Sequence, residues 1–374
     1  MTNRLQELHA AGQSIWLDFI ERSLLHSGDL ERRIADDALT GMTSNPTIFE
    51  KALSEGAEYD AQLAAAPPGH SAWDLFEMIE TEDVRTACDI FRIVYDRARG
   101  GDGYVSIEVS PGAANDTDAT VSEAHRLWAM VDRPNVMIKV PGTPEGARAV
   151  RRLIADGLNV NITLLFAVEA YRTIIDAYFD GLEDRLHDGR PIDRIASVAS
   201  FFVSRVDTEV DKRLDALVAG GMKPERANEL RGRAAVANAK LAYALFRERF
   251  SGARWQALAA RGARLQRPLW ASTSTKNPAY RDVLYVEDLI GPDTVNTMPP
   301  ATIEAFRDHG IVKRTVDVDL DAAHATMRDL EQAGISVRDV TRTLLVNGLA
   351  SFGKSFDTLI ARLGEKTGAV ATRA

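Results

Sequence analysis

The sequence predicts an α/β protein, a single-domain (β/α)8 (TIM) barrel with helical insertions and a C-terminal helix. Eight short runs of β-forming residues alternate with helical patterns along the 374 residues, and this strict alternation is typical of a parallel sheet. Most of the runs end in a polar or ionisable residue, as barrel strands do at the face that carries an active site. Eight units favour a closed barrel. An open doubly wound sheet is the alternative, although no glycine fingerprint follows the first predicted strand.

The predicted strands are short and are bounded by proline, glycine or polar residues. The clearest is the fifth, in which Leu158, Val160 and Ile162 alternate with polar residues, so that the two sets of side chains face opposite sides. Two consecutive prolines end the eighth strand. In chain order the segments are residues 14–19, 39–43, 104–109, 136–140, 158–163, 195–203, 268–273 and 294–298.

Helical periodicity fills the segments between the strands and follows the last one. One helix start is marked by Thr143, which suits an N-cap, and by Pro144, which suits the first helical position. We expect one domain over residues 1–374, with helical insertions at about 46–100 and 207–265 and C-terminal helices at about 300–366. The last helix either covers the barrel mouth or forms an oligomer contact. The sequence leaves this choice open, together with the choice between a monomer and a homodimer.

The composition is that of a globular protein that binds neither nucleic acid nor membrane. The hydrophobic fraction of 45% and the charged fraction of 26% are ordinary, and the net charge of −9 argues against a nucleic-acid surface. No segment is apolar over the length that spans a bilayer. Cys88 is the single cysteine, so no intrachain disulfide can form, and residues 1–13 lack the pattern of a signal peptide. We therefore expect a cytoplasmic protein.

Neither a metal nor an organic cofactor is expected from the motifs. The seven histidines are scattered without the spacing of a metal site. The chain contains no GxxxxGK[ST] loop. The glycine-rich segment 100–103 lacks the spacing of a dinucleotide loop and precedes its strand instead of following it. It is better interpreted as a simple loop.

Lys139 lies near the end of a buried strand, in the β-forming run 136–140. Because side chains alternate along a strand, Lys139 shares a face with Met137, while Ile138 and Val140 face the other way. Burying a lysine costs several kcal/mol unless it is paired, neutral or functional. A lysine at a strand end can also extend its stem toward solvent. This segment alone supports both interpretations.

The other strand ends favour a functional interpretation of Lys139. In a barrel the carboxyl ends of all strands meet at one mouth, where enzymes of this fold place their chemistry. Solvation of a loop explains one polar residue there, but not a ring of them around a lysine and two carboxylates. The ring consists of Asp18, Asn45, Glu108, Lys139, Asn161 with Thr163, Ser200 and Ser272.

These residue types suit Schiff-base chemistry on a sugar phosphate. Burial disfavours a charged amine, and the neutral amine of Lys139 can attack a ketone to give a carbinolamine and then a Schiff base. Glu108, on the adjacent strand, can move the protons that dehydration needs, directly or through a water. Asp18 remains as the base that takes a proton from a β-hydroxyl when a carbon–carbon bond breaks. The uncharged Asn45, Asn161, Ser200 and Ser272 suit a polyol, and Arg205 and Lys276 suit a phosphate.

Four segments resemble the signatures of transaldolase. They are GMTSNPTIF (41–49), MIKVPGT (137–143), GLNVNITLLF (157–166) and ASFFVSR (199–205). The matches occur in the family's order, cover roughly residues 14–300, and are similar to the longer bacterial branch of transaldolase within the class I aldolase superfamily.

The resemblance implies a cofactor-free reaction of sugar phosphates in the non-oxidative pentose phosphate pathway. A dihydroxyacetone unit passes from sedoheptulose 7-phosphate or fructose 6-phosphate to glyceraldehyde 3-phosphate or erythrose 4-phosphate. On this resemblance Lys139 is the Schiff-base residue, Glu108 with Thr163 holds the water used in proton transfer, and Asp18 takes the proton of the hydroxyl on carbon 4. Asn45, Asn161 and Ser200 would hold the three-carbon unit.

The phosphate site is where this sequence departs from the family. The resemblance implies that Arg205 and Ser272 bind the phosphate. Many transaldolases carry an arginine two residues after the serine of the seventh strand, and Ser274 stands there instead. Lys276 is close enough in sequence to take over the role of that arginine.

Two other functions compete with transfer. A plain aldolase would release free dihydroxyacetone, but Phe202 forms an apolar wall where a hydroxylated residue would favour protonation of the enamine. A catalytically silent sugar-phosphate-binding barrel is the second alternative. Lys139, Glu108 and Asp18 argue against it, because a binding protein has no use for an amine beside two acids.

Overall fold

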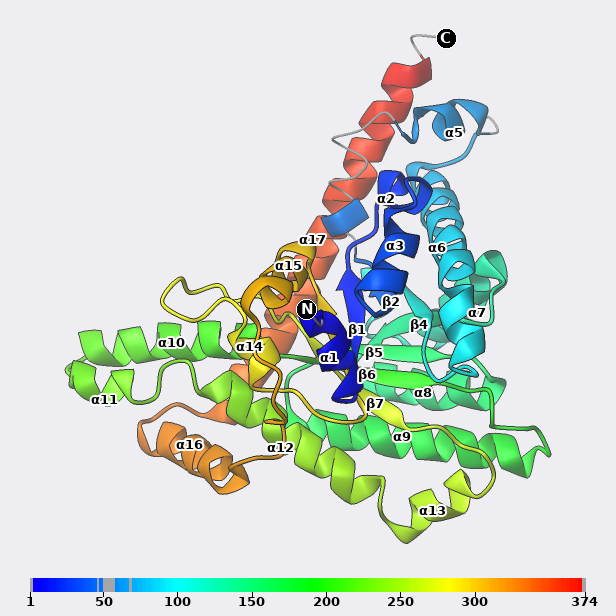
Figure 1. Cartoon of the computed structure of the whole chain (residues 1–374). Coiled ribbons are helices and arrows are strands. Elements are labelled where there is room, and N and C mark those ends of the chain that lie inside the picture. Colours follow the sequence, from blue (N-terminus) through cyan, green and yellow to red (C-terminus); the bar gives the residue numbers. More distant parts are fainter. Residues whose placement is uncertain (1–2, 46, 50–57, 67–68, 372–374) are drawn as a thin grey trace.

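A closed barrel of parallel strands forms the centre of the molecule (Figure 1). In this computed structural model, which describes residues 3–45, 47–49, 58–66 and 69–371, eight strands pair in chain order and the first closes on the last. The predicted barrel is therefore confirmed, and the open sheet is excluded. The strands are β1 (Gln13–Asp18), β2 (Leu39–Thr43), β3 (Tyr104–Glu108), β4 (Val136–Pro141), β5 (Val160–Leu165), β6 (Ser197–Phe202), β7 (Gln266–Ala271) and β8 (Thr294–Met298).

Helices surround the barrel and cover one of its ends (Figure 1). Residues 46, 50–57 and 67–68 of the helical segment predicted at 46–100 lie outside the described residues. No helix in the described part of the chain is long and apolar enough to cross a membrane. The helices are α1 (Arg4–Ala10), α2 (Arg22–His26), α3 (Asp29–Asp36), α5 (Asp60–Ala65), α6 (Ala72–Arg97), the 3-10 turn η1 (Pro111–Ala113), α7 (Thr117–Val131), α8 (Pro144–Asp156), α9 (Val168–His187), α10 (Ser204–Ala219), α11 (Pro224–Asn228), α12 (Ala234–Arg249), α13 (Ala253–Ala259), α14 (Leu284–Glu287), α15 (Pro300–His309), α16 (Leu320–Gln332) and α17 (Val337–Ala371).

Two strands are displaced by two residues from their predicted positions. β7 ends at Ala271, and the next residue, Ser272, has a φ of 57° in the left-handed region, away from regular strand geometry. β5 starts at Val160, directly after Asn159, whose backbone oxygen already accepts from the Ile138 nitrogen at 3.0 Å and whose side chain connects chain segments. Its amide donates to the backbone oxygens of Pro134 and Val136, at 2.9 and 3.0 Å. Local periodicity does not reveal either constraint.

Side-chain alternation along β4 separates the interior of the barrel from the layer beneath the helices. Met137 packs inside the barrel, in a cluster with Trp16 and Tyr104. Ile138 and Val140 belong instead to the large core between strands and helices. Lys139 consequently points along the barrel interior, one step nearer the mouth than Met137. Its neighbours in register are Glu108 on β3 and Asn161 on β5.

The C-terminal helix α17 passes from α10, across the strand ends, to α5 and α6 (Figure 1, red). Its first turn is tied to α10 by an ion pair between Asp339 and Arg213, at 2.8 Å. Farther along, the Phe356 ring lies 4.9 Å from that of Trp73 and 5.4 Å from that of Phe76, between ring centroids. The helix thus covers the barrel mouth, one of the two roles that the sequence left open.

Candidate active site

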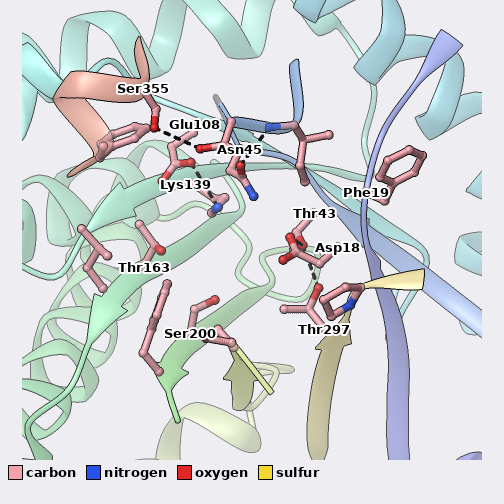
Figure 2. A pocket seen from close by; sticks show the side chains of 18 of the residues that line it. Asp18, Phe19, Thr43, Asn45, Glu108, Lys139, Thr163, Ser200, Thr297 and Ser355 are labelled. Atoms are coloured by element: carbon pink, nitrogen blue, oxygen red, sulfur yellow. Dashed lines mark hydrogen bonds and ion pairs between the residues drawn. The ribbon is translucent and has the colours of Figure 1, made fainter. Parts of the chain in front are cut away.

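A cavity of about 750 Å³ opens at the carboxyl ends of the strands (Figure 2). Of the ten residues predicted from the sequence to act on or bind a substrate, the described cavity wall contains all except Asn161. They are Asp18, Asn45, Glu108, Lys139, Thr163, Ser200, Arg205, Ser272 and Lys276. These residues come from segments spread over most of the chain, so the barrel topology is what gathers them.

Lys139 and Glu108 form a buried ion pair at the centre of this cavity (Figure 2). The Nζ atom of Lys139 donates to Glu108 Oε2 at 3.2 Å and to the backbone oxygen of Ser44 at 3.0 Å. Burial raises the pKa of the Glu108 carboxyl, an effect that Lys139 opposes and Asp18 reinforces. An amine in direct contact with a carboxyl of raised proton affinity is an arrangement suited to proton transfer during attack on a carbonyl.

Asp18 lies across the cavity from Thr163 and Ser200 (Figure 2). Its Oδ1 atom accepts a hydrogen bond from the Thr43 hydroxyl at 2.8 Å, and that hydroxyl is 2.7 Å from the Thr297 hydroxyl. Burial raises the pKa of Asp18, while the cations on the wall and the hydrogen bond from Thr43 act against this rise. The site therefore contains two carboxyls in different surroundings, which allows them to divide the acid and base steps.

Thr43 and Thr297 were missed by the sequence interpretation. Both line the cavity, and they connect the ends of β2 and β8 to Asp18. Their position near strand ends was a usable signal, because the same argument selected Asp18 and Glu108. A threonine in a strand attracts less attention than an ionisable residue, since threonine is a common strand residue.

Asn45 follows β2 and reaches the cavity beside Lys139 (Figure 2). Its side-chain oxygen accepts from the backbone nitrogen of Ile48 at 3.2 Å, and its backbone oxygen accepts from the same nitrogen at 3.1 Å. This turn fixes the Asn45 side chain and leaves its amide NH2 group available as a donor next to the amine.

Asn161 lies below the cavity and not on its wall. Its oxygen accepts from the Ser200 hydroxyl at 2.7 Å, and its amide donates to the Ser106 hydroxyl at 3.0 Å. The side chain is fully buried. Asn161 therefore orients Ser200, which does line the cavity, whereas the sequence grouped both residues as direct contacts of a polyol.

The cationic side of the cavity is built by the first turn of α10 and the loop after β7. The guanidinium of Arg205 lies over the Phe202 ring, 5.1 Å from its centroid. Lys276 Nζ donates to the Ser274 hydroxyl at 2.7 Å. Ser274 stands where the resemblance described above implies an arginine, and this hydrogen bond holds the ammonium group of Lys276 beside that position.

Helix α17 contributes a wall of the cavity, and none of its residues there was singled out from the sequence. Gly348, Ser351, Phe352 and Ser355 line it. The Ser355 hydroxyl accepts from the Thr47 hydroxyl at 3.1 Å, which connects α17 to the segment after β2. Nothing local in the helix indicates which face meets the mouth, because its placement depends on packing against distant elements.

Glu80 is a further buried acid, on the side of α6 that faces the barrel. The residue is 4% exposed. Burial, followed by the charges of Glu108, Glu77 and Glu123, raises the pKa of Glu80 well above its usual value. The sequence did contain a signal for this buried acid, because Glu80 lies on the apolar face of an amphipathic helix, but the sequence interpretation missed it.

Known proteins resemble the chain over almost its whole length. The family model described as transaldolase/fructose-6-phosphate aldolase matches residues 15–363. A transaldolase of Thermobifida fusca is 50% identical over 371 residues, covering 99% of this chain and 100% of the relative. A transaldolase of Trichodesmium erythraeum is 46% identical over 372 residues, covering 98% of each chain. One of Acidothermus cellulolyticus is 50% identical over 363 residues, covering 96% of each chain.

Proposed function

Since this chain belongs to the transaldolase/fructose-6-phosphate aldolase family, we propose that it is a transaldolase acting through a Schiff base on Lys139. It transfers a dihydroxyacetone unit from sedoheptulose 7-phosphate or fructose 6-phosphate to glyceraldehyde 3-phosphate or erythrose 4-phosphate. The observation that carries the mechanism is the buried amine of Lys139, 3.2 Å from Glu108 at the barrel mouth.

Schiff-base formation uses Lys139, Glu108 and Thr163. Glu108 takes a proton from the ammonium group, and the neutral amine attacks the ketone carbon of the substrate. Glu108 then returns a proton to the carbinolamine hydroxyl through a water that Thr163 helps to hold, and this hydroxyl leaves as water. The upward shift in the pKa of Glu108 caused by burial supports this role, because a carboxyl with increased proton affinity is better able to accept a proton and return it.

Cleavage uses Asp18 as the base. Asp18 takes the proton of the hydroxyl on carbon 4, the bond between carbons 3 and 4 breaks, and its electrons move to the iminium nitrogen. The aldose phosphate leaves, and an enamine remains on Lys139. A second aldose phosphate then accepts the enamine carbon, and Asp18 returns the proton to the new hydroxyl. The position of Asp18 across the cavity, on a different strand from Glu108, supports a separate step for each acid.

The ends of the substrate have different environments. Asn45 and Ser200, with Asn161 beneath Ser200, suit the hydroxyls of the three-carbon unit near Lys139. Arg205, Ser272 and Lys276 suit the phosphate. The hydrogen bond from Lys276 to Ser274 supports the assignment of Lys276, because it directs a cation toward the position that this sequence leaves without an arginine.

Transfer is favoured over release of free dihydroxyacetone by the apolar wall at Phe202. The Phe202 ring lies 5.2 Å from that of Phe166 and lines the cavity. This part of the wall, formed by the Phe202 ring with Phe166 packed behind it, offers no hydroxyl to protonate the enamine, so the intermediate persists until an aldehyde binds. The same proposal includes sugar phosphates as partners and the cytoplasm as the place of action.

Borohydride reduction in the presence of fructose 6-phosphate tests the proposal directly. Reduction should attach a stable sugar-derived group to Lys139, and mass analysis of peptides should find it there and not on Lys276, which lines the same cavity. Borohydride without sugar is the control. A label on another lysine, or none with either ketose phosphate, contradicts the mechanism. Formation of free dihydroxyacetone at the rate of transfer to erythrose 4-phosphate would identify an aldolase instead.

A further inference from the structure

Leu164, next to Thr163 on β5, has a backbone conformation that is rare for leucine. Its φ is 58°, in the left-handed region that non-glycine residues seldom adopt. The register between β5 and β6 shifts between Ile162 and Leu165. Consecutive residues of a regular strand face opposite sides, yet Thr163 and Leu164 both line the cavity. The left-handed residue is what allows both side chains to face the mouth.

A glycine on α17 makes room for the Leu164 side chain. A Cβ atom at Gly348 would lie 3.1 Å from Leu164 Cδ2 and 3.7 Å from Cδ1. The first distance is tighter than ordinary van der Waals contact, so even an alanine would push against the leucine. Leu164 is only 7% exposed and lines the cavity, so a displaced leucine side chain has room only on the cavity side. A backbone conformation of this kind persists only where the surrounding packing enforces it.

The helix cannot move away from a larger residue at this position without breaking other contacts. On one side of Gly348, Asp339 is held by Arg213 at 2.8 Å. On the other side, Phe356 packs on the rings of Trp73 and Phe76. Because α17 is anchored on both sides of Gly348, a larger side chain at position 348 would displace Leu164 and not the helix. A displaced Leu164 would in turn shift the adjoining Thr163.

Thr163 is where such a displacement would matter. Its hydroxyl forms no hydrogen bond with any other residue that the structure describes, although the residue is only 2% exposed. Figure 2 shows its side chain on the Lys139 side of the cavity. Because no hydrogen bond to a described side chain fixes this hydroxyl, its position depends on the backbone of β5, which includes the left-handed Leu164.

We propose that Gly348 is a positioning residue for proton transfer, which acts through Leu164 to hold the Thr163 hydroxyl toward Lys139 and Glu108. The inference rests on the proposed function, in which Thr163 helps to hold the water that carries the proton. It assigns to the C-terminal helix a role in a chemical step, in addition to covering the mouth.

Two matched glycine substitutions on α17 test it. Gly348→Ala should lower kcat by about tenfold and slow the accumulation of the borohydride-trapped Schiff base, because small displacements of a proton-transfer group are costly. The KM for fructose 6-phosphate should stay within about twofold of the wild-type value, since Thr163 is not assigned to binding. Gly353→Ala is the control. Its Cβ would lie 3.9 Å from Pro111 Cβ, an ordinary contact, and both changes raise helix propensity equally.

The route through Leu164 is tested by a double-mutant cycle. Leu164→Ala removes both Cδ atoms, so adding Gly348→Ala to this variant should change kcat by less than about twofold. An equal loss in both backgrounds overturns the proposal, as does a Gly348→Ala enzyme that behaves like Gly353→Ala. If Gly348→Ala does not fold, Leu164→Gly tests the same link. That change frees the backbone at Thr163 and should lower kcat with KM unchanged, and wild-type kcat would overturn the proposal.

Failure of the proposed function would have a different signature. Wild-type protein that is not labelled at Lys139 would contradict the Schiff-base mechanism and, with it, this inference. Wild-type labelling together with an unaffected Gly348→Ala variant would contradict this inference alone.

Discussion

Both ends of the barrel bury charged side chains, but the buried carboxyls at the two ends differ in how many hydrogen-bond and ion-pair partners they have. The carboxyl ends of the strands, where the cavity lies, are here called the open end, and the amino ends, opposite the cavity, are called the closed end. At the closed end, Asp102 is surrounded by donors. Its Oδ1 accepts from Trp16 Nε1 at 2.9 Å, and its Oδ2 accepts from the Ser14 hydroxyl. Arg267 pairs with the same carboxylate at 3.4 Å and donates to the Ser14 hydroxyl at 2.7 Å. This acid is compensated by a cation and by hydrogen bonds to both of its oxygens.

At the open end, the two buried acids have far fewer partners. Within the part of the chain that the structure describes, Asp18 accepts one side-chain hydrogen bond, from Thr43, and Glu108 accepts one, from Lys139. Burial raises the pKa of both carboxyls. The contrast teaches that one barrel uses buried charge in two ways. The carboxylate at the closed end is fully paired, whereas incomplete pairing at the open end leaves proton affinity available for the proton transfers that we propose.

The largest expected effect is on catalysis at the open end. Asp18→Asn should lower kcat by roughly 10²–10⁴-fold, as expected for loss of a general base. The Schiff base should still form and be trapped, because cleavage is the step that needs Asp18. Glu108→Gln should instead slow formation of the Schiff base, so rapid-quench trapping separates the two acids. Normal cleavage by Asp18→Asn would remove the role assigned to it.

The same Asp18→Asn variant should gain stability, in a manner that depends on pH. Because the pKa of Asp18 is higher in the folded than in the unfolded state, the folded protein binds more protons between the two values, and the carboxyl destabilises the fold as pH rises. Urea unfolding should show the variant to be more stable than wild type at pH 8. The gain should vanish below about pH 4, near the unfolded pKa. A pH-independent difference would contradict this account.

The next effect is on stability at the closed end. Asp102→Asn leaves Arg267 without its charged partner, and breaking a buried pair from one side costs about 3–5 kcal/mol in the free energy of unfolding. The kcat should stay within about twofold of wild type, because the network is remote from the mouth. Asp96→Asn, which removes the partner of Arg92 in an exposed pair, is the control and should cost less than about 1 kcal/mol. If Asp102→Asn lowered kcat and left the free energy of unfolding unchanged, the assignment of a structural role to the closed end and a catalytic role to the open end would be wrong.

The smallest effects are expected at the rim of the open end. Arg205→Ala should raise the KM for fructose 6-phosphate by about 10–100-fold, because a charge-assisted contact to phosphate is lost. Lys276→Ala should raise it less, since an ammonium is a point charge without the planar fork by which a guanidinium binds two phosphate oxygens. Unphosphorylated fructose, which lacks the group that both cations bind, should be about equally poor for wild type and both variants. An unchanged KM for Lys276→Ala would leave the phosphate to Arg205 and Ser272.

The sequence predicted much of the site because barrel strands convert local position into spatial proximity. Asp18 and Glu108 end their strands, and Lys139 lies near the end of its own. Once the fold is known, strand-end residues must meet at the mouth. The sequence did not indicate how far from the strand end a side chain can lie and still reach the cavity. Asn161 is two residues before Thr163 on β5, so its side chain lies beneath the cavity and not on the wall.

The sequence by itself determined the order of strands and helices, the face on which Lys139 lies, and the residues that converge at one end. These features follow from periodicities of two and 3.6 residues and from the geometry of parallel strands. Only the tertiary structure decided that α17 lies across the mouth, that Leu164 is left-handed, and that Thr43 and Thr297 support Asp18. Each of these depends on contacts between segments remote in sequence, and no local pattern records which distant surface a residue will meet.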